Sequence, residues 1–578
     1  MPGITSIPPL DRDESRFAQA SRQMLESVAL SEAERAAVPL DLYSGGLVVP
    51  KVIEKPRLNK PPLIYWLQAG SAWVFSLGEP LRDAVWMYRV PSVLSAWASV
   101  LLTWRIGLVL FDGRAALLGG VLLAICPLVV VDAHQARADQ LLLACTTAAM
   151  WAVARIVRAE ASRRASPGGT LPRPRPSRNV AAPVALALAV ALGVLAKGPI
   201  TPMVVGFSLV TYAAITRRWR VLFSSWPWLT AVVAVASLGP WVYAVAETVG
   251  FEEYRAMVFD ETVGRSTSAK EGHSGPPGYH ALLLPVLFFP GSIGLAMANI
   301  LLWSRCGWRR SGSGGAGWSL RWGGSWRLAF LASWLFPAWI VFELVSTKLP
   351  HYTMPMYPAG AILCGRAVLA AGPLARVASS KILRALVFGW ACIPAVVGAG
   401  LVVFARASSG LYQDSGVVLG AGVAGAVMLI GLFVSGRFGL ARVRAHLAAQ
   451  SVSWTVAVVV LFAVAAPGFN TMSPSITAAL DRLGWDGSPV VLGRYQEDSL
   501  VFMLRGRALR EGDKDRAVEA VLARPDRYFV VSPSAGLKVF PTKSVLVRGD
   551  SMSKGPRRRV RVGQLRPWAS PRAGRIVP

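Results

Sequence analysis

A small group of charged side chains and histidines stands out in this chain, because these residues lie before, between or at the ends of long apolar stretches. The acidic pair Asp13-Glu14 comes before the long apolar stretches, and Asp139 opens one of them. A positioned carboxylate can act as a base or orient a nucleophile, whereas Lys, Arg and His side chains bind phosphate. The candidate cations and imidazoles lie in loops or at the ends of apolar stretches: Arg57, Lys60, Lys197, Arg265, His273, Lys348 and His351.

Each of these residues also has a purely structural interpretation. The pair Asp13-Glu14 can be the acidic first turn of a helix, and Asp139 can be the N-cap of the span that follows it. Lys197 precedes Gly-Pro, so it can end a helix and reach the membrane interface. His273, in a Gly/Ser/Pro-rich loop, can be simply solvated. Two residues that flank a proline at a helix break can be ordinary interfacial side chains: Lys348 and His351.

The elements that must position these residues are membrane spans. Of 578 residues only 16% are charged, against about 25% in soluble proteins, and 53% are hydrophobic. The net charge of +29 accompanies 21 Trp and 21 Phe, which excludes a disordered or nucleic-acid-binding chain. The five cysteines show no paired spacing, and we expect neither a disulfide framework nor a metal site. The composition predicts a multi-pass membrane protein.

Stretches long enough to cross a bilayer recur from about residue 88. We predict about twelve spans, at 88–110, 115–131, 138–158, 180–196, 199–216, 226–248, 280–303, 327–346, 352–371, 381–405, 415–435 and 451–466. Every second loop is rich in arginine, and short basic loops stay in the cytoplasm. The other loops therefore lie outside, and all the candidate residues fall on that face. Cations and carboxylates above an apolar bundle suit a substrate with an anionic head and a lipid tail.

The same topology divides the chain into four parts. Residues 1–87 form an extracytoplasmic loop region, in which 61–78 lies on the membrane surface rather than crossing it. Residues 88–466 form the bundle. The runs at 490–492, 500–502 and 528–531 predict a small extracytoplasmic α/β domain over 467–553, and 554–578 reads as a basic disordered tail.

Two segments carry a resemblance to a known family. The run 13–25, DESRFAQASRQML, closely resembles the first-loop motif of bacterial aminoarabinose transferases and related mannosyltransferase-like enzymes. The run 60–67, KPPLIYWL, is similar to a segment that lies flat outside the bilayer in that family. Asp139, AKGP at 196–199, the stretch 265–273 and KLPHY at 348–352 follow in the family's order. The resemblance extends from about residue 11 to about residue 466.

This resemblance implies an all-α polytopic membrane bundle with the C-type glycosyltransferase fold and an inverting transfer from a polyprenyl-phosphate sugar. Asp13, with Glu14, would be the catalytic carboxylate, or would only position an acceptor that is itself a phosphate. Asp139 would be a second active-site acid. The leaving phosphate would be neutralised by fixed cations: Arg57, Lys60, Lys197, Lys348 and His351. Three further residues are candidates for substrate binding: Arg265, His273 and Tyr352.

The family's pattern also sets limits for this chain. Its first transmembrane helix normally precedes the Asp-Glu loop. Either such a helix is encoded upstream, which is the hypothesis we favour, or the loop is exported by other means. Asn59 stands where aminoarabinose transferases often have an acid, and we predict no metal and no cofactor.

We expect a bacterial inner-membrane enzyme with its site on the extracytoplasmic face. Its partners would be the lipid-linked donor, an envelope acceptor and the bilayer, with no nucleic acid. The alternatives are a transporter or flippase for lipid-linked sugars, which should show midplane charges and internal repeats, and a scaffold for envelope assembly.

Overall fold

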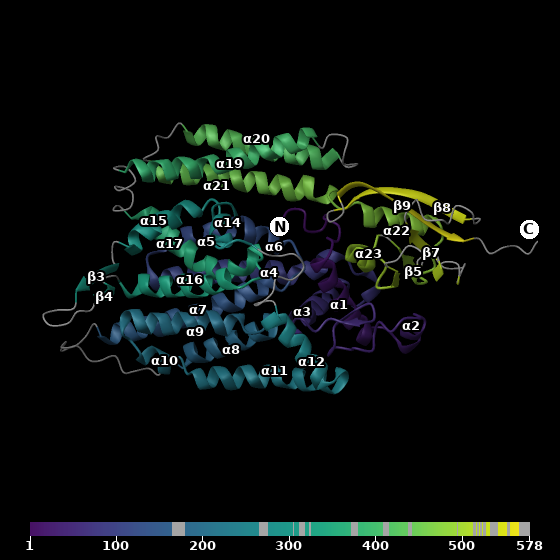
Figure 1. Cartoon of the computed structure of the whole chain (residues 1–578), viewed down its shortest axis with the longest axis horizontal. Helices are drawn as coiled ribbons and strands as arrows, with labels where there is room; N and C mark the ends of the chain where they lie inside the picture. The colour runs from purple at the N-terminus through teal and green to yellow at the C-terminus, as the bar shows by residue number, and fades with distance from the viewer. Residues whose placement is uncertain are drawn as a thin grey trace, which may run out of the picture.

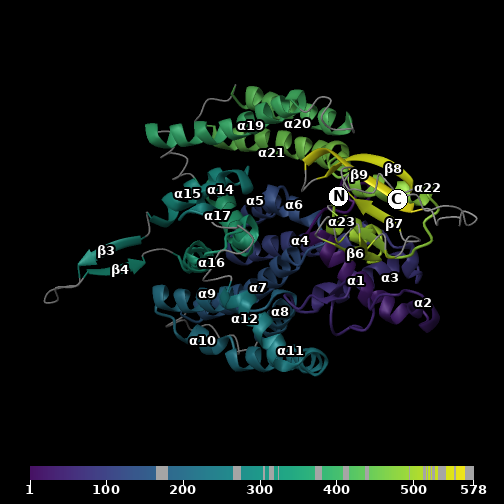
Figure 2. The ribbon, with the colours of Figure 1, turned by 45° about the vertical axis from the view of Figure 1, so that its right-hand side comes forward.

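The computed structural model is a helical bundle that carries a mixed α/β unit at one end (Figure 1). Near that end also lie the first helices of the chain, whereas the hairpin of β3 (Cys306–Arg310) and β4 (Trp318–Trp322) lies at the opposite end (Figures 1 and 2). The structure describes residues 1–164, 180–264, 275–303, 306–310, 318–322, 325–370, 380–407, 415–436, 442–493, 495–511, 516, 519–520, 523, 528–531, 542–551 and 555–565.

The bundle consists of helices that are apolar on most of their surface, as lipid requires. Its first half comprises α4 (Val85–Leu110), α5 (Gly113–Ala124), α6 (Pro127–Ala133), α7 (Asp139–Arg164), α8 (Ala181–Lys197), α9 (Ile200–Thr216), α10 (Arg220–Ser224), α11 (Pro227–Val249), α12 (Phe251–Phe259) and η2 (Asp260–Gly264). Its second half comprises α14 (Tyr279–Leu287), α15 (Ser292–Trp303), α16 (Trp326–Leu344), η3 (Pro350–Met356), α17 (Tyr357–Leu369), α19 (Lys381–Ala407), α20 (Ser415–Gly436), α21 (Val443–Val460), η4 (Leu461–Ala465) and η5 (Ala466–Gly468).

Several predicted spans differ in form from the helices found. Within the described residues, seven helices are long and apolar enough to cross a membrane, or eight if the bent pair α5–α6 counts as one span. That pair is bent by 55° at 125–126, so the predicted span 115–131 is broken. The predicted span 280–303 is divided into α14 and α15 around Pro290, and the last span begins at Val443 rather than 451. The total of about twelve stays a prediction.

The segment before the bundle folds against its end. It comprises α1 (Asp13–Ala29), α2 (Glu32–Ala36), β1 (Lys51–Val52), β2 (Lys55–Pro56), α3 (Leu63–Phe75) and η1 (Pro80–Arg82). The 13 residues of α3 extend only about 20 Å, which is too short to cross an apolar layer of about 30 Å. This length agrees with the prediction that 61–78 does not span.

In its described residues, the C-terminal unit contains a five-stranded sheet and the helices α22 (Met472–Arg482) and α23 (Asp498–Met503). The strands are β5 (Val490–Leu492), β6 (Ala508–Arg510), β7 (Tyr528–Val531), β8 (Thr542–Ser551) and β9 (Gly555–Leu565). The strand order is β6-β5-β7-β9-β8; β5 is parallel to β6 and β7, whereas β9 is antiparallel to β7 and β8.

Two segments of this unit bear on the sequence predictions. The run 500–502, one of those from which the α/β domain is predicted, lies in helix α23, and the prediction of disorder is wrong for residues 555–565, which form β9. The reason in the second case is that Val560 and Val562 are both buried in the core of the unit. Their alternation overrides the basic character of the neighbouring residues. The division at 467–553 and the placement of this unit outside the membrane stay predictions.

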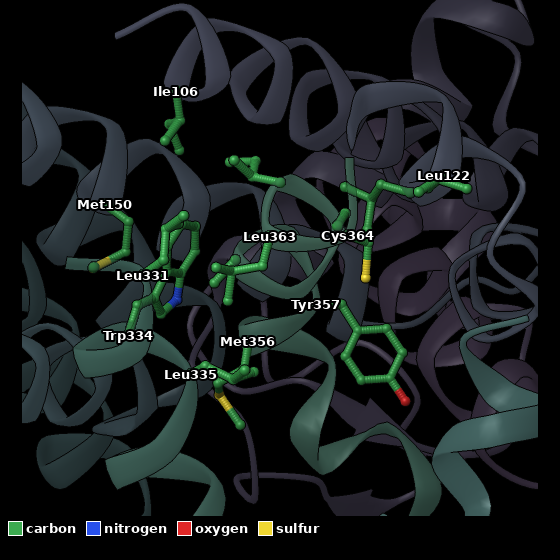
Figure 3. Packing of buried hydrophobic residues seen from close by; sticks show 14 of the residues in the cluster. Ile106, Leu122, Met150, Leu331, Trp334, Leu335, Met356, Tyr357, Leu363 and Cys364 are labelled. Carbon is green, nitrogen blue, oxygen red and sulfur yellow. The ribbon is translucent and has the colours of Figure 1, made fainter. Parts of the chain in front are cut away.

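Tight packing in the bundle holds η3, the short helix that carries the candidate residues His351 and Tyr352. Trp334 of α16 is fully buried, and its indole N–H donates to the carbonyl of Pro355 at 3.2 Å. Figure 3 shows Trp334 and Leu335 together with Met356 and Tyr357, at the junction of η3 and α17. Dense packing of this kind leaves η3 little freedom, so the side chains that η3 carries have defined positions.

Candidate active site

Six charged or titratable side chains lie together at the end of the bundle that we predict to face the outside of the membrane. We call this group the ion cluster. These side chains come from six separate elements and connections, and they meet between the start of α1 and the start of α7. The members of this ion cluster are Asp13, Arg57, Arg137, Asp139, Lys197 and His351.

Arg137, in the connection between α6 and α7, is the centre of the cluster. Its guanidinium nitrogens lie 3.5 Å from Asp13, 3.5 Å from Asp139 and 3.8 Å from Asp132. Its Nη2 also lies 3.5 Å from Nε2 of His351. One cation is therefore shared by three carboxylates and an imidazole.

Asp139 is the buried carboxylate of the cluster. It begins α7, is 4% exposed, and forms an ion pair with Lys197 at the end of α8. The Lys197 ammonium also lies 5.9 Å from the ring centre of Tyr352, within cation–π range. Gly198, with φ +70°, ends α8 directly after Lys197, so this lysine both closes its helix and faces the cluster.

Asp13 is the exposed carboxylate of the cluster. It begins α1, its side chain is 51% exposed, and it lies 3.6 Å from Arg57 and 3.5 Å from Arg137. Burial opposes its ionisation, but the guanidinium groups of Arg137, Arg57 and Arg16 outweigh that effect and lower the pKa of Asp13. The carboxylate is thus ionised at neutral pH and open to an incoming group.

His351 is neutral in this arrangement. Burial lowers its pKa to about 3; Asp139 opposes the shift, while Arg137 and Lys197 add to it. Its Nε2 lies 3.5 Å from Nη2 of Arg137 and 3.5 Å from Oδ1 of Asp139, so this nitrogen accepts from the guanidinium in one tautomer and donates to the carboxylate in the other.

The remaining predicted cations lie around the cluster or outside the described residues. Lys60 pairs with Glu261 of η2 and donates to the carbonyl of Asn59. Lys348 is buried in the connection between α16 and η3, and the described residues give it no ion pair. Arg265 and His273 lie outside the described residues, so their predicted roles are not addressed by the structure.

Glu14 does not join the cluster, although it follows Asp13 directly. Its side chain is 1% exposed and forms a two-pronged ion pair with Arg89 of α4, at 2.7 and 2.9 Å. It also accepts from the backbone N–H groups of Leu10 and Ala136, at 2.8 and 3.0 Å. Both carboxylate oxygens are therefore occupied, which suits an anchor for α1 better than a reacting group.

The C-terminal unit holds α1 from the other side. Arg16 of α1 pairs with Asp498 of α23 at 2.7 Å. Further along α1, Arg22 binds Asp83 at 2.7 Å. Arg505, which follows α23 in the C-terminal unit, binds the same Asp83 at 2.7 Å and also pairs with Glu26 of α1. These bonds fix the helix that presents Asp13.

Sequence reasoning missed Arg137 and Asp132. The signal was present, because the short loop 132–139 (DAHQARAD) holds two acids, an arginine and a histidine between two apolar helices. A charged group at the edge of a membrane span is a functional candidate by default.

Comparisons with known proteins agree with this architecture. Residues 59–166 match the sequence profile of the dolichyl-phosphate-mannose-protein mannosyltransferase family. The undecaprenyl phosphate-alpha-4-amino-4-deoxy-L-arabinose arabinosyl transferase of Edwardsiella ictaluri is 24% identical over 61% of this chain and 54% of its own length. The enzyme of the same name from Pectobacterium atrosepticum is 26% identical over 70% of this chain and 64% of its own length. The chain therefore matches less than two thirds of the length of these relatives.

Solved structures agree over a longer range. The crystal structure of ArnT from Cupriavidus metallidurans bound to undecaprenyl phosphate has a TM-score of 0.69 at 20% identity, covering 99% of this chain and 96% of that one. The apo structure gives a TM-score of 0.66 at 19% identity, covering 97% and 95%. The chain is thus a multi-pass membrane protein with the fold of ArnT from Cupriavidus metallidurans, and in sequence it resembles the bacterial aminoarabinose transferases and the mannosyltransferase-like enzymes.

Proposed function

We propose that this protein transfers a sugar from a polyprenyl-phosphate carrier to an acceptor of the cell envelope, with inversion at the anomeric carbon. The acceptor is a lipid, a glycan or a protein, and the reaction takes place on the extracytoplasmic face of a bacterial inner membrane. Support comes from the relatives named for undecaprenyl phosphate-linked aminoarabinose and from the shared fold of ArnT bound to undecaprenyl phosphate.

One observation carries the proposal: the cluster places an exposed and a buried carboxylate on the same arginine. Asp13 and Asp139 both lie 3.5 Å from Arg137, but Asp13 faces solvent and Asp139 faces Lys197 and His351. An acceptor can reach Asp13, while the cations beside Asp139 suit a phosphate. The proposed binding sites for the acceptor and for the donor phosphate thus lie next to each other.

Asp13 is the group that deprotonates or orients the acceptor. It is ionised because neighbouring guanidinium groups lower its pKa, and its side chain is half exposed. If the acceptor is itself a phosphate, no base is needed and Asp13 only orients it. Asp139 is the second acid, which holds Lys197 and Arg137 in place.

The cations stabilise the leaving phosphate. Negative charge builds on the phosphate as the glycosidic bond breaks, and cations that are already in place lower that barrier. This role falls to Lys60, Lys197, Lys348 and Arg57, with Tyr352 packed beside Lys197. His351, which is neutral, contributes to phosphate binding as a hydrogen-bond donor rather than as a cation. Arg265 and His273 remain candidates for substrate binding.

The charge balance gives Lys348 a distinct part in this role. Three carboxylates of the cluster region, Asp13, Asp132 and Asp139, face three cations, which are Arg57, Arg137 and Lys197. Burial and the charge of Asp139 raise the pKa of Asp132 to about 7, so Asp132 carries only part of a negative charge at neutral pH and the cations are not fully balanced. His351 adds no charge, because its pKa is about 3. Within the described residues Lys348 has no carboxylate partner, so its charge is available to a phosphate.

The test is sugar transfer by the purified full chain from radiolabelled donors to envelope fractions. Two donors, undecaprenyl phosphate-linked 4-amino-4-deoxyarabinose and undecaprenyl phosphate-linked mannose, separate pentosyl from hexosyl transfer. We expect Asp13→Asn to lower transfer by about 10²- to 10⁴-fold, as for loss of a general base.

The matched control is Asp112→Asn. Asp112 caps α5 by accepting from two backbone N–H groups at 3.0 Å, and asparagine caps a helix equally well. This variant should transfer sugar at the normal rate. Equal transfer by Asp13→Asn and the parent chain would remove Asp13 from the reaction, and movement of labelled lipid across vesicles without transfer would indicate a flippase instead.

A further inference from the structure

A buried histidine–glutamate pair lies outside the ion cluster. His280 of α14 is 2% exposed, and its Nε2 lies 3.1 Å from the carbonyl oxygen of Leu349. A carbonyl only accepts, so Nε2 carries the proton and donates it. The other ring nitrogen, Nδ1, lies 3.5 Å from Oε2 of Glu343.

Glu343 is held by two other donors, while Nδ1 of His280 and Oε2 of Glu343 face each other without a hydrogen bond between them. Its Oε1 accepts from the backbone N–H of Ala281 at 3.1 Å and from the indole N–H of Trp339 at 3.2 Å. The carboxylate thus joins the end of α16, where Glu343 is the last residue but one, to the start of α14. The imidazole of His280 continues this connection to Leu349.

The segment tied by these bonds is the connector 345–349, which joins α16 to η3. Glu343 precedes it, Leu349 ends it, and His280 contacts both. The imidazole therefore lies between the two ends of a five-residue connector: it is hydrogen-bonded to the last residue of the connector and lies beside the carboxylate that precedes the first.

Lys348 lies in this connector. Its stem packs on the chain just before α14: a Cβ added at Gly275 would lie 3.1 Å from Cδ of Lys348 and 2.7 Å from the ring of Tyr279. The start of α14 thus contacts the connector twice, once through His280 and once around the Lys348 stem. Three residues after Lys348, η3 carries His351 into the ion cluster.

We infer that His280 is a positioning residue, which holds the 345–349 connector through Leu349 so that Lys348 faces the phosphate of the lipid carrier. This inference rests on the proposed function. It assigns no contact between His280 and the substrate, because the imidazole acts through the Leu349 carbonyl.

Binding of undecaprenyl phosphate to the purified full chain in detergent tests the inference. His280→Leu removes one buried hydrogen bond to the connector, and we expect the Kd to rise about tenfold. Lys348→Ala removes a charge-assisted contact, and we expect a rise of about 30-fold. Because His280 acts through Lys348, the double variant should bind no more weakly than Lys348→Ala alone.

Two conservative variants keep the test valid if His280→Leu does not fold. In His280→Gln the amide N–H lies close to the position of Nε2, so the bond to Leu349 is retained and binding should be rescued. In His280→Asn the shorter amide lies near Nδ1 and cannot reach Leu349, so binding should weaken about tenfold, as in His280→Leu. The matched control is His446→Leu, a buried histidine at the start of α21, which adjoins the far end of α17 through Arg444. It should leave binding unchanged.

The possible results separate this inference from the proposed function. Normal binding by folded His280→Asn, or additive losses in the double variant, would overturn the positioning role and leave the transferase proposal intact. No binding of undecaprenyl phosphate by the parent chain would overturn both. Weaker binding by His280→Asn, rescue by His280→Gln and non-additivity with Lys348→Ala together would support it.

Discussion

The replacement Glu14→Gln tests the division of roles between two adjacent carboxylates. Glu14 and Arg89 are 1% and 0% exposed, and each Glu14 oxygen accepts one bond from Arg89 and one from a backbone N–H. The amide of glutamine has a single acceptor oxygen. If that oxygen keeps the bonds from Nε of Arg89 and the N–H of Ala136, the NH₂ group of the glutamine faces two donors, the N–H of Leu10 and Nη2 of Arg89.

The expected loss of stability follows from these two contacts. A neutral hydrogen bond contributes about 1 kcal/mol and one to a charged group about 2 kcal/mol, so the loss is about 3 kcal/mol. This agrees with the range of about 3–5 kcal/mol for removing one partner of a buried ion pair. A change of about 3 kcal/mol corresponds to a factor of roughly 100 in the folding equilibrium.

Denaturation in mixed micelles measures this loss, and sugar transfer at low temperature measures what remains of activity. We expect Glu14→Gln to lose about 3 kcal/mol of stability but to keep its turnover within about tenfold while folded. The control is Glu34→Gln in the exposed capping box of α2, since glutamine also serves there and the change should stay within about 0.5 kcal/mol.

A catalytic Glu14 would give the opposite pattern. Turnover would fall by about 10²- to 10⁴-fold, as for a general base, while stability stayed normal. That result would refute the reasoning, because it would mean that a carboxylate with both oxygens occupied still reacts. The double variant Glu14→Gln, Arg89→Met provides a second check. Because it also removes the guanidinium that Glu14→Gln leaves unpaired, its loss of stability should be smaller than the sum of the losses in the two single variants.

Three more predictions follow from the charged groups around α1 and η3. His351→Gln should reduce the loss of stability at low pH. Burial holds the pKa of His351 in the folded chain at about 3, against the usual 6.5, so between these pH values the imidazole binds a proton only in the unfolded chain. The parent chain therefore loses about 2 kcal/mol of stability by pH 5. Unfolding at pH 7 and pH 5 measures this, and equal pH sensitivity in both proteins would contradict it. Arg137→Met removes a cation that lowers the pKa of Asp13, so the acidic limb of the pH–rate profile should move to higher pH; an unmoved limb would show that Asp13 does not set it. Arg505→Gln should destabilise the fold by about 3–5 kcal/mol, whereas the exposed Arg482→Gln should change stability by less than about 0.5 kcal/mol; similar unfolding of the two would contradict the anchoring role.

The gathering of Asp13, Asp139, Lys197 and His351 could be predicted from the sequence. Three of them lie at or close to the ends of apolar stretches, and alternation of basic loops places those ends on one face. Membrane spans run nearly parallel, so residues at the same ends of neighbouring spans converge even when they are far apart in the chain. The same reasoning predicted the helical bundle.

The breaks within spans could not be predicted in this way. The hydropathy of 115–131 is continuous, yet Pro127 begins a new helix at a bend of 55°. A proline removes one backbone donor but does not by itself decide between a kinked and a broken helix. That choice depends on neighbouring helices, whose contacts the local pattern does not contain. Residues 555–565 present a similar case, because their strand depends on pairing with β7 and β8.

Contact distances separate the reactive carboxylate from the structural one, and no local pattern contains those distances. Glu14 binds Arg89 at 2.7 and 2.9 Å with almost no exposure, whereas Asp13, one residue earlier, lies 3.5 and 3.6 Å from its two arginines and is 51% exposed. Charge-assisted hydrogen bonds are about 2.7–2.9 Å long, so Glu14 is fully bound and Asp13 is only held nearby. Arg137 likewise lies 3.5 to 3.8 Å from each of its carboxylates. Groups that are charged and close, but not yet bonded at short range, can still form bonds with a substrate, and this geometry favours Asp13 rather than Glu14 as the group that meets the acceptor.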